Sequence, residues 1–201
     1  MLEGLDSIDW ASLQHAYGTA SDVPDLLRSL LAEDKQIRDN AIWELFGNIH
    51  HQGTIYEASS YTIPFLMEIL ESPDCLDKDS IACLVVCIVG YYEVYATGVM
   101  KKDVVEILAK QNKSLNEVSW EESEIIHRVR SVALPYIPRL LPYLQNVELV
   151  DQCGYEFALM LSRYPEYFET TIPVLENAVS VQTDDDIKEK MQALLDDMKK
   201  L

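Results

Sequence analysis

The stretch from Val23 to Gly53 constrains the fold more than any other part of the chain, because it predicts two short helices in succession. Asp22 suits the N-cap of the first helix, and Pro24 suits its first turn, where the amide hydrogen that proline lacks would have no helical partner. The first helix has an apolar stripe of Leu26, Leu27, Leu30 and Leu31, and the second has one of Ile37, Ala41, Leu45, Phe46 and Ile49. Two such helices cannot bury both apolar faces alone, so the stretch predicts further copies stacked against it.

Prolines in similar settings mark the expected copies. A basic residue follows Pro24 by fourteen positions and Pro64 by the same number, and Pro138 and Pro173 stand in comparable sequence. Their separations of 40, 74 and 35 residues leave room for one unit without its proline in the middle gap. We therefore predict a single domain over 1–201. It comprises a capping segment at 1–20 and repeats at 21–53, 62–96, 101–133, 135–164 and 171–201.

This arrangement resembles the HEAT repeat, a helical hairpin of about forty residues. Three segments, 15–24, 49–53 and 63–66, resemble more narrowly the small stand-alone HEAT-repeat proteins of bacteria. The resemblance implies an all-α fold, a right-handed α-α superhelix of the HEAT/armadillo-like solenoid class with about five helical hairpins and an N-terminal capping helix. Glycine and proline are few and the dipeptides Asn-Gly and Asp-Gly are absent, which also favours a chain built of helices.

Helices are expected at both ends of the chain. Residues 5–18 predict a leading helix that ends at Gly18 and covers the open face of the first repeat. A last helix, from Asp184 to about Lys200, has acidic residues at its start and basic residues at its end, which suits the helix dipole. Both would close the stack against water.

The middle of the chain predicts a buried helix and a kinked one. A helix from about Asp79 contains a run at 81–92 without a charge, which is too short to span a membrane and therefore indicates a buried helix. Gly90 within it would let a neighbouring helix approach closely or mark a bend. The prolines Pro135, Pro138 and Pro142 predict a kinked first helix of the fourth repeat, with a partner helix from Glu148 to Arg163. Thr62, after a loop at 54–61, and Thr171 are expected to open the other two proline-containing helices.

The net charge of −18 limits the possible partners. Residues 1–100 carry 16 acids and 4 bases, a balance of −12, and residues 101–201 carry 18 acids and 12 bases, a balance of −6. Such a surface repels nucleic acid and anionic lipid, since binding to phosphates requires clustered Lys and Arg. It attracts a basic protein. The alternative is that the charge only keeps the chain soluble.

The four cysteines lie in or beside apolar helical sequence and have no C-x-x-C pair. Cys75, Cys83, Cys87 and Cys153 therefore look like small core residues of a chain in a reducing compartment. Cys83 and Cys87 share a helix face, so a shared metal is conceivable, but no accompanying His or second Cys pair supports it. We predict no metal and no cofactor. The acidic start of the chain lacks a signal peptide pattern, and we expect a cytoplasmic protein.

Residues that can catalyse are present, but they form no recognisable constellation. His50 and His51 are expected at the end of a helix, where adjacent side chains point about 100° apart, and His15 and His127 are isolated. No nucleophile, zinc or phosphate-loop motif occurs. We predict that the chain is not an enzyme. The enzymatic alternative is the HEAT-like family that acts on alkylated DNA bases, whose basic groove disagrees with the charge of −18.

The resemblance implies that the second helix of each repeat lines the concave side. On the helix at 35–51, Asn40, Trp43, Gly47 and His50 fall opposite the core stripe. Trp43 is then an exposed anchor of the kind that dominates protein interfaces, or it packs against Trp10 or Tyr17 as part of the cap. The predicted partner-binding set is Asn40, Trp43, Glu44, Gly47, His50, His51, Tyr91, Tyr92, Glu93, Tyr95, Tyr155 and Glu156. The tyrosines could equally belong to the core.

The function that these observations favour is binding of a basic protein on the concave face, without catalysis. The resemblance suggests an immunity protein that neutralises a toxin by covering it. The alternatives are a scaffold subunit of a larger complex, a DNA-base glycosylase and a binder of small ligands.

Overall fold

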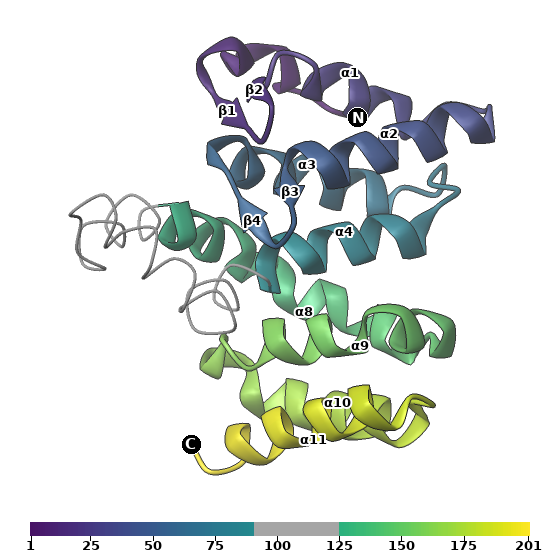
Figure 1. The fold of residues 1–201 in the computed structure, drawn as a ribbon, viewed down its shortest axis with the longest axis vertical. Helices are drawn as coiled ribbons and strands as arrows, with labels where there is room; N and C mark the ends of the chain where they lie inside the picture. The colour runs from purple at the N-terminus through teal and green to yellow at the C-terminus, as the bar shows by residue number, and fades with distance from the viewer. Residues whose placement is uncertain (91–124) are drawn as a thin grey trace, which may run out of the picture.

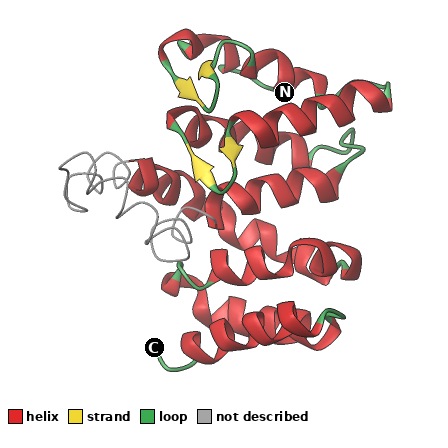
Figure 2. Cartoon of the chain, in the orientation of Figure 1, coloured by secondary structure: helices red, strands yellow, loops and turns green. Residues whose placement is uncertain are grey.

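The computed structural model describes residues 1–90 and 125–201, and this part of the chain is mostly helical (Figure 2). The predicted all-α class is confirmed at this level. The α-helices are α1 (Val23–Ser29), α2 (Lys35–Asn48), α3 (Glu57–Glu71), α4 (Lys78–Gly90), a helix at 125–133, α8 (Ile137–Leu140), α9 (Val147–Leu161), α10 (Phe168–Val181) and α11 (Asp185–Met198). Shorter 3-10 turns are η1 (Leu5–Ser7), η2 (Trp10–Ser12), η4 (Leu134–Tyr136), η5 (Leu141–Gln145) and η6 (Pro165–Tyr167).

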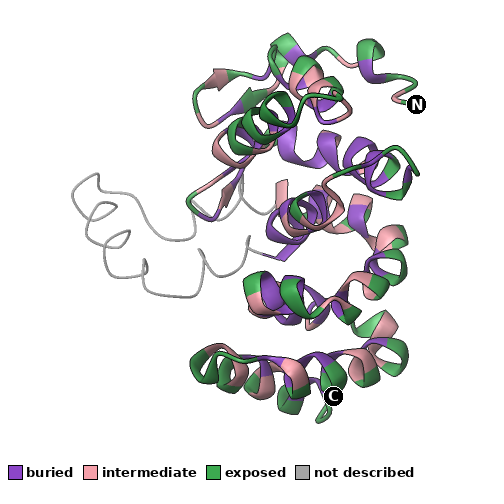
Figure 3. Cartoon of the chain, turned by 90° about the vertical axis from the view of Figure 1, so that its right-hand side faces the viewer, coloured by how far each residue is buried: buried purple, intermediate pink, exposed green. Residues whose placement is uncertain are grey.

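The helices follow one another down the molecule in packed pairs, from α1 and α2 at one end to α10 and α11 at the other (Figure 1). Within pairs, α1 packs on α2, α3 on α4, η5 on α9 and α10 on α11. Between pairs, α2 contacts α4, α4 contacts α9, and α9 contacts both α10 and α11. One cluster of buried apolar residues runs through all of them, and α4 is far more buried than the terminal helix α11 (Figure 3).

Several predicted helix starts are confirmed by their capping bonds. The side chain of Asp34 accepts a hydrogen bond from the amide of Gln36 at the start of α2 (2.8 Å), and Asp184 accepts one from Ile187 at the start of α11 (3.0 Å). Pro24 lies in the first turn of α1, as expected. Asp22 precedes it but caps nothing with its side chain, because its carboxylate is engaged elsewhere.

Proline shapes the helices of the C-terminal half in two ways. The expected kinked helix is a succession of short pieces, η4, α8 and η5, each with a proline in its first turn. A backbone N–H in the first turn has no helical acceptor, so proline there costs no helical hydrogen bond. In α10, by contrast, Pro173 lies inside the helix, which begins three residues earlier than the predicted start at Thr171.

The predicted leading helix over 5–18 is wrong. This segment forms η1, η2 and a two-stranded antiparallel sheet, in which β1 (Gln14–His15) pairs with β2 (Gly18–Thr19). The hydroxyls of Ser7 and Ser12 donate to the carbonyls three residues before them, at 2.6 and 2.7 Å, and such local bonds compete with a continuous helix. Gly4 and Gly18, at φ 82° and 131°, also adopt backbone angles outside the helical range.

A second hairpin replaces the expected end of the helix at 35–51. α2 ends at Asn48, and β3 (His50–His51) pairs with β4 (Thr54–Ile55). Gln52 and Gly53, at φ 49° and 84°, form the two-residue turn with positive φ at both positions that suits the twist of a hairpin. The predicted loop at 54–61 and N-cap at Thr62 are therefore wrong, because α3 begins at Glu57 and Thr62 is buried within it.

α4 contains residues 81–90 of the apolar run expected to be buried, and all of these except half-buried Cys83 are buried. A Cβ on Gly90 would lie 2.9 Å from the carbonyl oxygen of Glu156 on α9, so glycine permits the close approach of these two helices. No helix in the described ranges is long and apolar enough to cross a membrane. The predicted elements between 91 and 124, including the end of the repeat at 62–96 and most of the one at 101–133, lie outside the described residues.

Candidate protein-binding face on helix α2

Trp43 on α2 is largely in solvent, with 78% of its surface exposed. This exposure is incompatible with the alternative that Trp43 fills the N-terminal cap. The tryptophan that fills this role is Trp10, which is 4% exposed, lies against Tyr61 and Phe65, and donates its indole N–H to the carbonyl of Leu5 at 2.8 Å. Trp43 therefore stabilises no core, and its large apolar surface is available to a partner.

A pocket of about 430 Å³ lies beside Trp43, between α2 and the start of α4. Half-buried Ile42 and Phe46 form its apolar wall together with Trp43, and Asp39 and Ser80 add polar groups. Sequence reasoning placed Phe46 in the core stripe and did not use Ile42. In the structure both are half-buried beside the start of α4, which contacts α2.

The predicted residues of α2 form one exposed stripe. Asn40 and Glu44 are exposed beside Trp43, and Gly47 is half-buried one turn further along. Glu44 forms no ion pair with any described residue, whereas Asp39 accepts both of its short bonds, at 2.6 and 2.7 Å, from the ammonium of Lys35. The stripe therefore carries one uncompensated carboxylate next to the exposed indole.

Tyr17, which is not in the predicted partner-binding set, extends this stripe beyond α2. Its side chain is 69% exposed, and its ring lies 4.0 Å from the position that a Cβ on Gly47 would take. It packs edge-on against His51, with ring centroids 5.2 Å apart, and its hydroxyl lies 3.2 Å from Nδ1 of His51. We call the surface formed by Tyr17, Asn40, Trp43, Glu44, Gly47 and His51 the aromatic face.

A hydrogen-bond network around Asp22 holds Tyr17 in place. The Asp22 carboxylate contacts Nε2 of His15 at 2.9 Å and accepts from the side-chain amide of Asn48 at 2.7 Å. Nδ1 of His15 accepts from the backbone N–H of Tyr17 at 3.0 Å, so Nε2 is the ring nitrogen that donates to Asp22. The network ties the β1–β2 hairpin to the C-terminal end of α2, where Asn48 lies.

A short sequence repeat could have revealed both hairpins. A histidine is followed three residues later by Gly-Thr at 15–19 and again at 50–54. In each case the Gly-Thr pair stands at the start of the returning strand or just before it. The pattern is too short to show a strand periodicity, which explains why periodicity alone missed it.

His50 does not belong to the aromatic face, and its place in the predicted set is wrong. It is buried, with its ring 6.4 Å from that of Phe46. Burial lowers the pKa of His50 to about 4, so the ring is neutral at pH 7. The helix wheel failed here because α2 has already ended at Asn48, and His50 follows strand geometry instead.

Tyr155 and Glu156 of the predicted set are not joined to the aromatic face. Tyr155 and Glu156 are half-buried on α9, and α4 lies between α9 and α2. Tyr91, Tyr92, Glu93 and Tyr95 lie outside the described residues.

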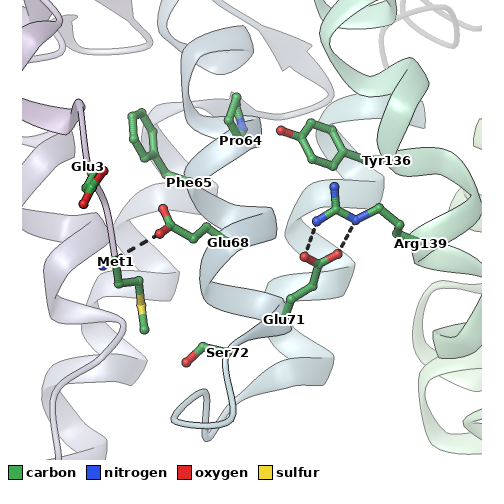
Figure 4. A pocket seen from close by; sticks show the side chains of 9 residues that line it. All are labelled: Met1, Glu3, Pro64, Phe65, Glu68, Glu71, Ser72, Tyr136 and Arg139. Carbon is green, nitrogen blue, oxygen red and sulfur yellow. Dashed lines mark hydrogen bonds and ion pairs between the residues drawn. The ribbon is translucent and has the colours of Figure 1, made fainter.

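A larger pocket of about 550 Å³ lies beside α3, between the N-terminal segment and η4 with α8 (Figure 4). Phe65 and Tyr136 face it together with several charged groups. The guanidinium of Arg139 stacks on Tyr136 and binds both carboxylate oxygens of Glu71, and Glu68 accepts from the amide of Leu2 at 2.9 Å. Most of these charges compensate one another, which leaves little net attraction for a ligand.

No group of His, Cys, Asp and Glu side chains in the two described ranges is arranged to hold a metal ion. All four cysteines are free thiols. Comparisons with protein-family models, curated proteins and solved structures returned no match to this sequence.

Proposed function

We propose that this chain is a non-enzymatic protein-binding module that holds a basic protein against its aromatic face. The observation that carries the proposal is the exposure of Trp43 beside an apolar pocket. Exposed aromatic side chains with a polar surround are typical anchors of protein interfaces, and a tryptophan that stabilises no core has no other evident use.

Charge supports the basic nature of the partner. The first hundred residues, which contain the aromatic face, have a balance of −12. Glu44 on the face itself forms no ion pair with a residue of the described ranges, so a Lys or Arg of the partner would gain an ion pair without displacing any of the described ones.

The finer architecture belongs to the same proposal. The stacked helix pairs are consistent with a HEAT-like solenoid, a right-handed superhelix of about five hairpins, in which the second helix of each pair lines the binding side. The resemblance to small bacterial HEAT-repeat proteins favours an immunity protein that covers a basic toxin. A scaffold role would use the same face, whereas DNA-base glycosylase chemistry would require attraction to DNA, which the charge opposes.

The test compares wild type with two variants of α2 as immobilised baits for proteins of the native cell. Trp43→Ala removes the anchor, and Ile37→Ala is the matched control, since Ile37 is 47% exposed on the same helix but outside the aromatic face. We expect wild type and Ile37→Ala to retain the same basic proteins and Trp43→Ala to lose them. Equal retention by all three, or tight binding to DNA at moderate salt, would refute the proposal.

A further inference from the structure

Gly47 is a helical glycine that the described part of the chain does not require. It lies in the last turn of α2, and its φ is not positive. Among the described residues, a Cβ at this position would meet only the ring of Tyr17, at 4.0 Å, which is an ordinary contact. Gly90 and Gly154 differ, because a Cβ there would lie 2.9 and 3.0 Å from atoms of other helices. Since glycine destabilises a helix relative to alanine, packing among the described residues explains Gly90 and Gly154 but not Gly47.

The missing side chain at Gly47 leaves part of the α2 surface uncovered. Side chains of a helix lean towards its N-terminus, so a residue covers the turn before its own Cα. For position 47 that turn contains Trp43 and Glu44, which lie four and three residues earlier and are both exposed. Gly47 itself is half-buried and therefore still open to solvent. The space over Gly47 is thus flanked by an indole and a carboxylate.

Tyr17 and His51 border the same space. The Tyr17 ring is the nearest group to the position that a Cβ on Gly47 would take, and it packs edge-on against His51. Nδ1 of His51 lies 3.1 Å from the carbonyl oxygen of Gly47 and 3.2 Å from the hydroxyl of Tyr17. These contacts hold both rings against the end of α2, so an aromatic wall is in place before a partner binds.

The groups around the space over Gly47 favour one kind of occupant. Trp43 and Tyr17 are 78% and 69% exposed, and aromatic rings attract cations over their faces. Glu44 forms no ion pair with a described residue, and an apolar or acidic side chain placed over it would leave its carboxylate without a partner. Arginine suits both groups, because its planar guanidinium stacks on a ring and forks towards a carboxylate. The lysine ammonium is a compact, strongly hydrated point charge and stacks less well.

We propose that an arginine side chain of the basic partner occupies the space over Gly47, stacks on Trp43 and pairs with Glu44. This site rests on the function proposed above, because the arginine belongs to the protein that the aromatic face holds. The net charge of −18 favours it, since the same surface attracts a guanidinium from a distance. Glycine at position 47 then has a reason, because a larger side chain would cover the turn on which the guanidinium lies.

The first test uses three capped tripeptides with glycine on either side of arginine, lysine or citrulline. Citrulline has nearly the shape of arginine but no charge. Titration of the isotope-labelled full chain with each peptide, followed by NMR, reports on the indole N–H of Trp43 and the amide of Gly47. We expect the arginine peptide to shift both signals and to bind at least about threefold more tightly than the other two. An arginine peptide that binds no more tightly than either control, or that shifts neither signal, would overturn the proposal.

Gly47→Ala separates recognition from folding. The added methyl group makes only an ordinary contact and suits a helix, so the melting temperature should stay the same or rise slightly. The methyl group occupies the proposed site, so the arginine peptide should bind at least about threefold more weakly. Glu44→Gln should reduce its affinity to that of the citrulline peptide, and Ile37→Ala, outside the aromatic face, should bind as wild type. A Gly47→Ala chain that binds the arginine peptide normally, or that melts well below wild type, would contradict the proposal.

Retention of the native partner by the same variants distinguishes a failure of this site from a failure of the proposed function. We expect immobilised Gly47→Ala to retain the partner more weakly than Ile37→Ala does. Loss of the partner by Trp43→Ala together with full retention by Gly47→Ala would refute the arginine site and leave the proposed function standing. Equal retention by wild type and Trp43→Ala would refute the proposed function and, with it, the assignment of the arginine to a partner.

Discussion

Trp43 and Trp10 are the same residue type in opposite environments, and they make a matched pair of substitutions. Because Trp43 is 78% exposed, Trp43→Ala should leave the melting temperature nearly unchanged but weaken binding of the partner by about 2 kcal/mol, or roughly thirtyfold in Kd. Trp10→Ala should lower the free energy of unfolding by about 3 kcal/mol, since it empties a packed site. Calorimetry of melting and of binding measures both effects.

A loss of stability without a loss of affinity would show that Trp43 has a structural role. A Trp43→Ala protein that melts far below wild type yet binds with normal affinity when folded has lost packing and not a contact. In that case the apolar pocket beside Ile42 would not be the binding site.

Buried His50 predicts a pH dependence of stability. Its pKa is about 4 in the folded chain against about 6.5 in the unfolded chain, so the unfolded state binds the proton first as the pH falls. The stability contributed by His50 is therefore complete above pH 6.5 and decreases, by up to about 3 kcal/mol, between pH 6.5 and pH 4. Urea unfolding at a series of pH values measures it.

Two variants isolate the contribution of His50 from that of the many carboxylates. His50→Gln should flatten the stability curve between pH 6.5 and pH 4, whereas His127→Gln, at an exposed helical position, should leave its shape unchanged. A His50→Gln curve parallel to that of wild type would show that this histidine titrates normally.

Residue positions were predictable from the sequence only where the element was also predicted correctly. The helix wheel placed Asn40 and Trp43 on the solvent side because α2 is a regular helix through these positions. It failed for His50, beyond the end of α2, and it missed Tyr17, whose segment was expected to be a helix and is a hairpin.

Arg38 links the α1–α2 connection to the α3–α4 connection, which belong to neighbouring helix pairs. Arg38 is 6% exposed, and its guanidinium donates to the carbonyls of Ala32 (2.9 Å) and Glu33 (2.8 Å) and pairs with Asp77 just before α4. Arg38→Ala leaves these acceptors and a partly buried carboxylate without their donor, and should reduce the free energy of unfolding by about 3 kcal/mol. Lys35→Ala, which removes a solvent-exposed ion pair from the same helix, should cost less than about 0.5 kcal/mol.

Chemical denaturation of both variants at neutral pH measures this difference. If the two substitutions cost the same, Arg38 contributes no more than a surface charge, and the loop between α3 and α4 must be held by other contacts.

At the scale of elements, the sequence predicted long amphipathic helices well and short irregular pieces poorly. α9 and α11 have an apolar stripe at helical spacing and lie where expected. The two hairpins have strands of two residues each, which is too short for any alternation to show. The β3–β4 turn depends on Gly53, and the β1–β2 hairpin is held by the bonds of His15 and Asn48 to Asp22, which only the folded chain brings together.

The charge of the whole molecule should control how fast the partner arrives. With a net charge of −18, association with a basic protein is accelerated by long-range attraction, and added salt screens this attraction over about 10 Å at 0.1 M. Glu44→Lys should slow association several-fold at low salt and much less at high salt, with little change in the dissociation rate. Stopped-flow kinetics at several salt concentrations tests this, and an effect independent of salt would show that Glu44 acts through a direct contact.

The stacked arrangement has a consequence for the order in which the molecule opens. α4 and α9 have neighbours on both sides, whereas the main packing partners of α11 among the described elements are α9 and α10. In a chain built from nearest-neighbour contacts, an end pair can detach without disturbing the pairs beyond its immediate neighbour, at a cost below that of global unfolding. Amide hydrogens of α11 should therefore exchange with solvent through partial opening, faster than those of α4, and the chain would behave as a set of linked cooperative units with its most persistent part in the middle.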